Sequence, residues 1–423
     1  MKYCFDYLDE VTRAQYEESA TKEYFDSTEC GVERIMNGII LPFVRPQEGE
    51  GISAGGGVLY ENGIWAEKSA QRIVGAEIDH GYPVEKDQCK YIDKSVMYFG
   101  AYHPHWGHFL TEQVGRCWYL ARHKEEIQDI YVAYFRKNDI CTSPMSGNYL
   151  EFLELLGIRK DHVIEVDAPT CFREVILPEL SCRMGIYHKK EYKEIFDAIR
   201  DSVILKKKTY PKIYFTRLKS KEFRGTSLGE KRLEKLFRSN GYKTIAPEHL
   251  SLKEQVWLMK NCKELVSVSG TLPHNILFAN DDIRTVILNR DIVINPYQMH
   301  INAIKEKEAI YIDACLALLP VFAGGPYLMM INENVVRYAQ DFSLRHKKNY
   351  ENAVSIHVKL AWYFFYYLDR MTEADIKKWN LDKKYGEYIM NRYGFYRSKL
   401  TYYDKRKVQL LRKCFYRLAK LFE

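Results

Sequence analysis

The sequence lacks the features by which several classes of protein are recognised. Its ten cysteines are scattered, with no Cys-x-x-Cys pair and no zinc-finger spacing. The first residues, 1–6, are polar and soon acidic, so they predict no signal peptide. Scattered cysteines without an export signal predict a reducing, cytoplasmic compartment rather than a disulfide framework.

Long apolar runs are missing as well. The longest, 309–324 and 361–368, fall short of the roughly 20 residues that a membrane-spanning helix needs, and the first contains Asp313 and Pro320. The sequence therefore predicts no transmembrane segment. With 423 residues, 46% of them hydrophobic, the chain is long enough for two cores and two or three domains.

Most of the chain has no excess of either charge. Residues 397–423 contain nine Lys or Arg against Asp404 and Glu423, a surplus of seven that equals the net charge of +7. Residues 1–396 therefore balance to zero, which argues against nucleic-acid binding. In the tail, apolar residues recur at helical spacing: Val408, Leu411, Phe415, Leu418 and Phe422. Basic residues fall on the opposite arc: Arg406, Lys413, Arg417 and Lys420. Such a helix can lie on an anionic membrane surface, or it can pack its apolar face on the protein.

Strands and helices alternate between residues 212 and 289. The pattern predicts strands at 212–217, 242–246, 265–268 and 284–288, and helices at 228–240, 252–261 and 272–279. Gly241 is placed to end the first helix, and Ser251 with Glu254 is placed to open the second as a capping box. This alternation predicts a parallel sheet with right-handed crossovers.

Ligands of parallel sheets bind beyond the carboxyl ends of the strands. Arg217 and the turn Ser269-Gly270-Thr271 follow two of the predicted strands. The small-residue turn precedes a predicted helix, whose free N–H groups suit a phosphate. The planar fork of an arginine grips a phosphate in two places. A nucleoside diphosphate is therefore the natural candidate ligand.

The remaining segments suggest three domains. Residues 55–65 predict a hairpin turning at Asn62-Gly63, although their three glycines could instead be taken for a phosphate loop. Residues 99–205 alternate again, and 206–211 predict a polar linker. The expected division is an N-terminal α/β domain at 1–205, a nucleotide-binding domain at 206–325 and a mostly helical extension at 326–423.

Several motifs occur in the order typical of one enzyme family. They are 106–112 with Arg116 and Leu120, Thr216-Arg217, Arg224-Gly225, 247–255 and 269–278. Together, over roughly residues 98–288, they resemble the catalytic domain of glycosyltransferase family 61. Many members carry a histidine and several glycines in the strand-to-helix turn, where this chain has Ser269 and keeps only Gly270.

The resemblance implies two facing Rossmann-like domains of the GT-B type, with the nucleotide in the second and a C-terminal helix crossing back to the first. It implies an inverting glycosyltransferase that moves a sugar from a nucleoside diphosphate, expected to be UDP, to a hydroxyl of a capsular or surface glycan. A lipid-linked acceptor would account for the basic tail and place the enzyme at the inner face of the plasma membrane.

The first motif supplies candidate catalytic groups. His108 and Glu112 are four residues apart and would share one helix face. A histidine held by a carboxylate suits a general base, and the resemblance gives His108 this role with Glu112 as the second candidate. Alternatively, His108 only caps a helix and Glu112 is a surface residue. A zinc site with His103 and His105 is a further alternative, but His-Pro-His is a poor chelate and no His-Glu-x-x-His is present.

The departing diphosphate needs fixed positive groups. No Asp-x-Asp triplet follows a predicted strand, so no metal is expected. The negative charge of the diphosphate would then be stabilised by Arg217, Arg224 and the N–H groups at 270–272. Glu248 is placed to accept from the ribose, and His274 and Asn275 to bond the donor, unless they are ordinary turn and capping residues. The rival hypothesis is a non-catalytic protein that binds a nucleotide sugar or glycan. A binding protein has no need of a base, which favours the enzyme.

Overall fold

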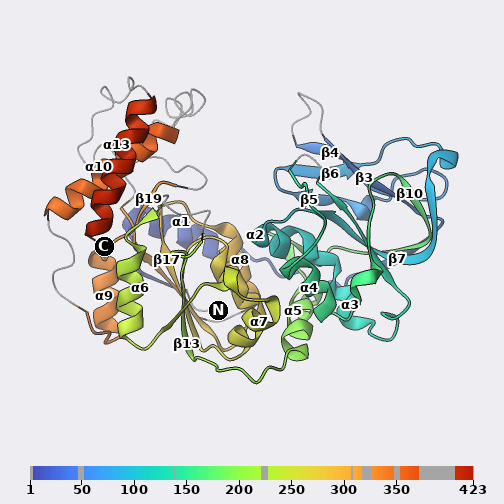
Figure 1. Ribbon diagram of the computed structural model, residues 1–423. Coiled ribbons are helices and arrows are strands. Elements are labelled where there is room, and N and C mark those ends of the chain that lie inside the picture. Colours follow the sequence, from blue (N-terminus) through green and yellow to red (C-terminus); the bar gives the residue numbers. More distant parts are fainter. Residues whose placement is uncertain are drawn as a thin grey trace.

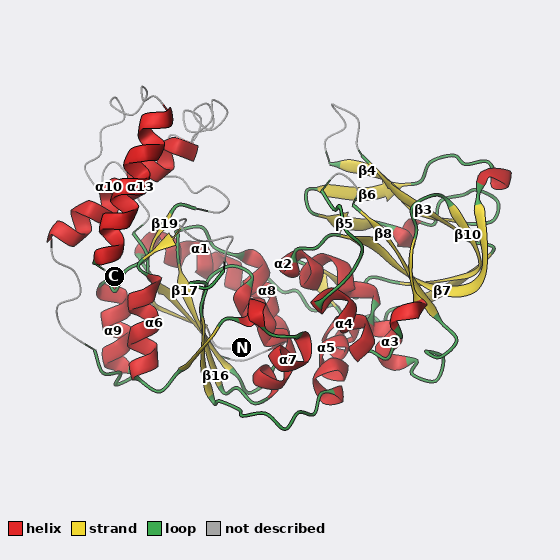
Figure 2. Ribbon diagram, viewed as in Figure 1, coloured by secondary structure: helices red, strands yellow, loops and turns green. Residues whose placement is uncertain are grey.

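The computed structural model describes residues 3–45, 52–137, 140–220, 227–305, 308–316, 325–346, 353–370 and 405–422. These residues form a mixed α/β protein built on two main sheets (Figures 1 and 2). Helices lie between the two sheets and on the outer face of the second, and a pair of C-terminal helices stands beside it (Figure 1).

The first sheet has nine strands and mixes parallel with antiparallel pairing. Its strands are β2 (Val32–Met36), β3 (Ile39–Val44), β4 (Ser53–Leu59), β5 (Gln71–Ile73), β6 (Ala76–His80), β7 (Lys90–Tyr102), β8 (Tyr131–Arg136), β9 (Val163–Glu165) and β10 (Thr170–Pro178). Strands β7 to β10 pair in parallel, as the alternating segment predicts, and β2 and β3 pair antiparallel with β10. The predicted hairpin turns at Asn62-Gly63 but closes on a single bridge, Leu59 to Trp65.

The second sheet is entirely parallel and has the order β1-β18-β17-β16-β13-β15. Its strands are β1 (Tyr3–Tyr7), β13 (Lys212–Phe215), β15 (Lys243–Ile245), β16 (Glu264–Val268), β17 (Arg284–Asn289) and β18 (Ala309–Asp313). The four strands predicted between residues 212 and 289 are confirmed to within two residues at each end. The helices around it are α1 (Glu10–Ala20), α6 (Glu230–Ser239), α7 (Leu252–Lys260), α8 (Pro296–Lys305) and α9 (Glu333–Asp341).

Local signals place the helix ends of this domain. Ser251 and Glu254 form the predicted capping box on α7. Gly241 follows α6 with a φ of +87°, the left-handed conformation expected of a residue that ends a helix. These contacts depend on neighbours in the chain, which is why the sequence predicts them well.

The chain begins in the second sheet, which its sequence did not indicate. β1 pairs in parallel with β18, although residues 1–205 were all expected in the first domain. Tyr16 of α1 donates to Asn289 at the end of β17, 2.9 Å away. The residues near β1 do not indicate this pairing, because the partner strand lies about 300 residues away and is set by the tertiary fold.

An apolar core continues from one domain into the other. It joins residues of α4 (Asn148–Leu155) and α5 (Lys190–Ser202) to residues of α7 and the segment 272–278. The Phe278 ring centroid lies 5.3 Å from Phe196 and 6.4 Å from Phe152. Burial of this surface fixes how the two domains face each other.

A pair of buried histidines also joins the domains. His188 Nδ1 lies 2.9 Å from Nε2 of His300 on α8, and the Gly185 N–H donates to the other ring nitrogen of His300. The Tyr24 ring stacks on His300 at 4.1 Å. Burial lowers the pKa of His188 to about 4 and the pKa of His300 to about 3. Both rings are therefore neutral near pH 7.

Acid is expected to destabilise the protein through this pair. Unfolded histidine titrates near pH 6.5, so the unfolded chain binds more protons than the native one as pH falls from 6.5 to 4. The free energy of unfolding therefore falls over that window, by on the order of 3 kcal/mol for each histidine. Thermal unfolding midpoints measured from pH 7 to 4 should fall less steeply for His300→Gln. Exposed His249→Gln is the control, and equal slopes for all three proteins would contradict this prediction.

The C-terminal helices α10 (Ala353–Arg370) and α13 (Lys405–Leu421) pack on each other. The Phe365 and Phe415 rings stack at 5.4 Å, and Ala419 is buried in one cluster with Leu228 and Leu328. The expected crossing back to the first domain is therefore wrong for α13, which lies against α10 and the second domain. Within the described residues, no helix is both long and apolar enough to cross a membrane.

Candidate active site

A cavity of about 490 Å³ lies where the two α/β domains meet. Its lining includes His105, Trp106 and Tyr149 from the first domain and Arg217, Glu248 and Thr271 from the second. We call it the Arg217 cavity. It lies beyond the carboxyl ends of the parallel strands, where ligands of such sheets bind.

The polar residues of this region follow the ends of three neighbouring strands. Arg217 follows β13, the turn Ser269–Thr271 follows β16, and Arg290 follows β17 directly. Because β16 lies between β13 and β17, the turn lies between the two arginines. Gly270 has a φ of +123°, and a Cβ on it would lie 2.7 Å from Arg217 Nη2 and 3.2 Å from Arg290 Nη2. Glycine is thus required both for the backbone conformation and for the close approach of the two guanidinium groups.

The two arginines create a strongly positive site. Arg217 is only 9% exposed, and burial, followed by the charge of Arg290, lowers the pKa of its guanidinium to about 9. Glu230 opposes this charge from one side, accepting the backbone N–H of Arg217 at 2.8 Å. The guanidinium of Arg290 lies over the Tyr327 ring at 4.1 Å. Two cations converging at a buried position favour an anionic ligand.

Arg290 was missed by the sequence analysis. It stands one residue after a correctly predicted strand, much as Arg217 stands two residues after β13. Applying the same carboxyl-end argument to that strand would have found it. Its convergence with Arg217, in contrast, follows only from the strand order.

The segment after Thr271 is not the α-helix that was expected. Residues Leu272–Phe278 (η7) form a short 3₁₀ helix, in which the His274 N–H bonds the Thr271 carbonyl. Pro273 removes one backbone donor from its first turn. A short 3₁₀ helix has a weak dipole, so the positive character of the site comes from the arginines rather than from a helix start.

The His108 motif forms an unusual helical segment. It passes from α2 (Trp106–His108) into a π-helical turn, Phe109–Gln113 (η3). His108 Nδ1 lies 2.8 Å from Glu112 Oε1, so the predicted contact is confirmed. Glu112 Oε2 accepts the Val74 N–H at 2.9 Å. π-Helical turns inside helices are frequent at functional sites.

Burial separates the roles of these two side chains. Glu112 is 7% exposed and His108 is 33% exposed, so the alternative that Glu112 is a surface residue is wrong. Both carboxylate oxygens of Glu112 are engaged, one by His108 and the other by Val74. Glu112 is therefore placed to orient the ring of His108.

The motif and the second domain touch directly. Trp106 Nε1 donates to Asn275 Oδ1 at 2.8 Å. A Cβ on Gly107 would lie 2.8 Å from Thr271 Oγ1. The residue before His108 thus contacts the turn that Arg217 and Arg290 flank. The structure brings the candidate base and the positive site together across the domain boundary.

Other predicted site residues are placed differently. Glu248 is exposed and lines the Arg217 cavity, as does Asn275. His274 is buried, and its Nδ1 lies 2.7 Å from Gln298 Oε1. Burial lowers the pKa of His274 to about 4. Its side chain is therefore part of the protein interior. Ser269 Oγ accepts the Arg290 N–H at 3.3 Å. Arg224 lies outside the described residues. Among the residues that are described, no three or more His, Cys, Asp or Glu side chains lie close enough together to hold a metal ion.

Comparison with known families agrees with this geometry. The profile of Glycosyltransferase 61 matches residues 106–288, a segment that begins at Trp106 and ends on β17. It therefore covers the His108 motif and the two strand ends after β13 and β16. The protein is a glycosyltransferase, and its residues 106–288 are similar to family 61. A search of the curated proteins found no match.

Proposed function

We propose that this glycosyltransferase inverts the configuration of a sugar as it moves it from a nucleoside diphosphate, a UDP-sugar, to a hydroxyl of a surface or capsular glycan. The observation that carries this proposal is that Gly107, directly before His108 of the His108–Glu112 pair, contacts a turn flanked by two arginines. In the GT-B arrangement that we propose, the first α/β domain presents the acceptor and the second binds the donor.

The proposed chemistry is a direct displacement. His108 takes the proton of the acceptor hydroxyl as its oxygen attacks the anomeric carbon, and the bond to the diphosphate oxygen breaks on the opposite face. Arg217 and Arg290 stabilise the charge that grows on the diphosphate. Glu112 holds the ring of His108 and favours its protonated form once the proton has moved.

A panel of sugar nucleotides tests the activity. We expect release of free nucleoside diphosphate from one UDP-sugar, at the same rate with and without a chelator, since two arginines can serve the leaving group. Activity lost in chelator and restored by manganese would overturn the metal-free part of the proposal. Tight donor binding without any release or transfer would favour the alternative, a non-catalytic protein that binds a nucleotide sugar or glycan.

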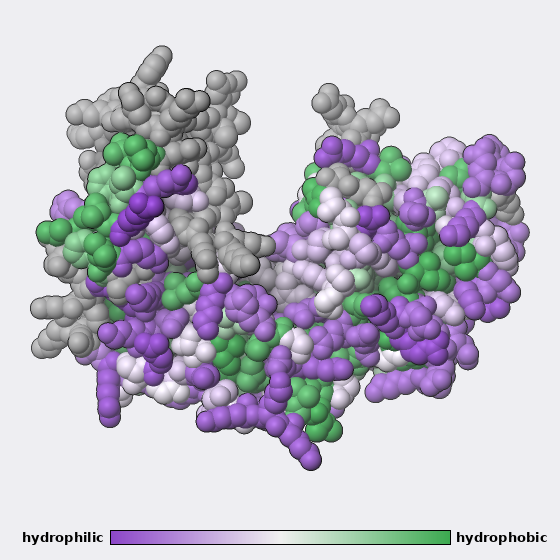
Figure 3. Space-filling model, viewed as in Figure 1, coloured by the Kyte–Doolittle hydropathy of each residue, from purple (hydrophilic) through white to green (hydrophobic). Residues whose placement is uncertain are grey.

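We further propose that α13 rests on an anionic membrane surface. One side of α13 packs on α10, but Leu410, Leu418 and Leu421 are 64%, 46% and 80% exposed. At 100° per residue these leucines form an arc beside a basic arc of Lys413, Arg417 and Lys420. Figure 3 shows apolar side chains gathered over this helical pair with a band of hydrophilic ones. An exposed apolar strip beside a basic one matches an interfacial helix. This position would bring the enzyme to a lipid-linked acceptor at the inner face of the plasma membrane.

Vesicle binding measures this contact. Changing Lys413, Arg417 and Lys420 together to Gln should weaken binding to phosphatidylglycerol vesicles at least tenfold, because each basic residue near such a surface contributes roughly 1 kcal/mol. Binding to phosphatidylcholine vesicles should be weak for both proteins. The matched control changes three exposed lysines elsewhere, Lys22, Lys124 and Lys160. Equal loss in both triple variants would overturn the assignment to α13.

A further inference from the structure

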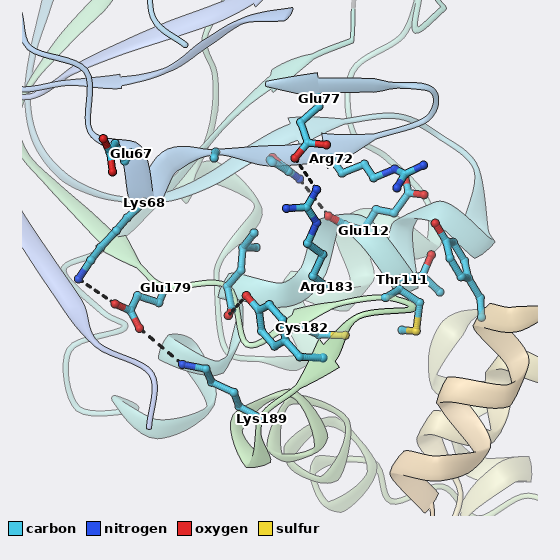
Figure 4. A pocket seen from close by; sticks show the side chains of 16 residues that line it. Glu67, Lys68, Arg72, Glu77, Thr111, Glu112, Glu179, Cys182, Arg183 and Lys189 are labelled. Carbon is cyan, nitrogen blue, oxygen red and sulfur yellow. Dashed lines mark hydrogen bonds and ion pairs between the residues drawn. The ribbon is translucent and has the colours of Figure 1, made fainter. Parts of the chain in front are cut away.

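A second cavity, of about 280 Å³, has Glu112 in its wall and shares no lining residue with the Arg217 cavity (Figure 4). Its walls come from residues 67–72 and 179–189 of the first domain, from Thr111 and Glu112, and from Tyr297 of α8. We call it the Arg72 cavity. None of the groups proposed for the chemistry except Glu112 lines it.

The His108 motif holds the walls of this cavity in place. Arg116 is fully buried and donates to the carbonyls of Lys68, Ala70 and Pro178 at 2.7, 3.0 and 3.1 Å. Gln71 is also buried and donates to the Glu112 carbonyl at 3.1 Å. These bonds tie both wall segments to one helical element, so the cavity is formed before any ligand enters.

Charged side chains of both signs line the cavity and are mostly paired. Arg183 contacts Glu77 at 2.6 Å, and Lys68 contacts Glu179 at 2.8 Å (Figure 4). Arg72 is exposed and forms no ion pair with the described residues. In Figure 4 its side chain extends toward Glu112. The lining thus offers donors and acceptors side by side, without a large excess of either charge.

This lining fits a sugar ring better than an anion. Each hydroxyl of a sugar both donates and accepts, so alternating cations and carboxylates can satisfy it. A phosphate would meet the carboxylates of Glu77, Glu112 and Glu179 as well as the cations. Tyr297 adds an aromatic face with a polar tip, a combination common in binding sites.

We propose that the Arg72 cavity binds a saccharide unit of the acceptor glycan, next to the unit that reacts. Glu112 forms its wall and contacts His108, so a bound unit lies one side chain away from the proposed base. Trp106 lines the Arg217 cavity, and Glu112, six residues further along the same helical segment, lines the Arg72 cavity. A chain of at least two sugars would thus reach from the reacting position into the cavity. This inference rests on the proposed function for the identity of its ligand.

Direct binding tests the cavity without knowledge of the natural acceptor. The probes are methyl α- and β-pyranosides and the common disaccharides, titrated into the full chain with UDP present. Arg72→Gln should weaken the binding of the best probe at least tenfold and leave the affinity for UDP unchanged. Arg173→Gln, an exposed arginine of the same domain that does not line the cavity, is the matched control and should bind as the native protein does.

The outcomes separate this inference from the proposed function. Loss of probe binding in Arg72→Gln alone supports the cavity even if no sugar nucleotide is hydrolysed. Transfer with an unchanged KM for the acceptor in Arg72→Gln would overturn the cavity while the proposed function stands. No binding of any saccharide, or binding of inorganic phosphate in its place, would overturn it as well.

Discussion

His108→Ala is expected to lower the turnover number roughly 10²–10⁴-fold, the usual effect of removing a general base. Its affinity for the donor should stay nearly unchanged, because the ring acts on the acceptor proton only as the new bond forms. Turnover with the responsive sugar nucleotide and calorimetric affinity for UDP measure the two quantities. His80→Ala, an exposed histidine that also contacts a carboxylate, is the control and should keep full activity.

Glu112→Gln distinguishes orientation from direct proton transfer. Both oxygens of Glu112 are already bonded, so we expect a smaller loss of turnover than in His108→Ala. An ascending limb of the pH profile near neutrality would be consistent with a histidine base, and a limb in the carboxylate range with Glu112. A folded His108→Ala protein with ordinary turnover would remove His108 from the chemistry and shift the role to Glu112 or His105.

Arg217→Ala and Arg290→Ala are each expected to weaken UDP binding about 10- to 150-fold, since a charge-assisted hydrogen bond contributes roughly 1.5–3 kcal/mol. Transfer should slow as well, because the same groups stabilise the departing diphosphate. Gly270→Ala should reproduce much of this effect with both arginines intact, because its Cβ would lie 2.7 Å from Arg217 Nη2. Calorimetry with UDP measures all three.

Two checks are needed before the arginine variants can be interpreted. Arg217→Ala leaves Glu230 buried without its cationic neighbour, and burial already raises the pKa of Glu230 to about 7, so the fold of this variant must be verified. Arg290→Ala has no such complication, and Arg173→Ala is the exposed control. Unchanged UDP affinity in a folded Arg290→Ala protein would show that only Arg217 belongs to the donor site.

Contacts within a few residues explain why parts of the sequence analysis succeeded. The capping box at Ser251 and the left-handed Gly241 depend on adjacent backbone groups, and the contact between His108 and Glu112 depends on helical spacing. The 3₁₀ helix after Thr271 was expected as an α-helix, because apolar spacing over seven residues does not separate the two.

The alternating elements of residues 212–289, the arginine after β13 and the histidine–carboxylate pair could be predicted from the sequence, because periodicity and spacing are local properties of a chain. The pairing of β1 with β18, the meeting of Arg290 and Arg217 beside Gly270, and the cavity shared by Arg72 and Tyr297 could not be predicted in this way. Those neighbours are far apart in sequence, and strand order and domain packing, rather than any local pattern, bring them together.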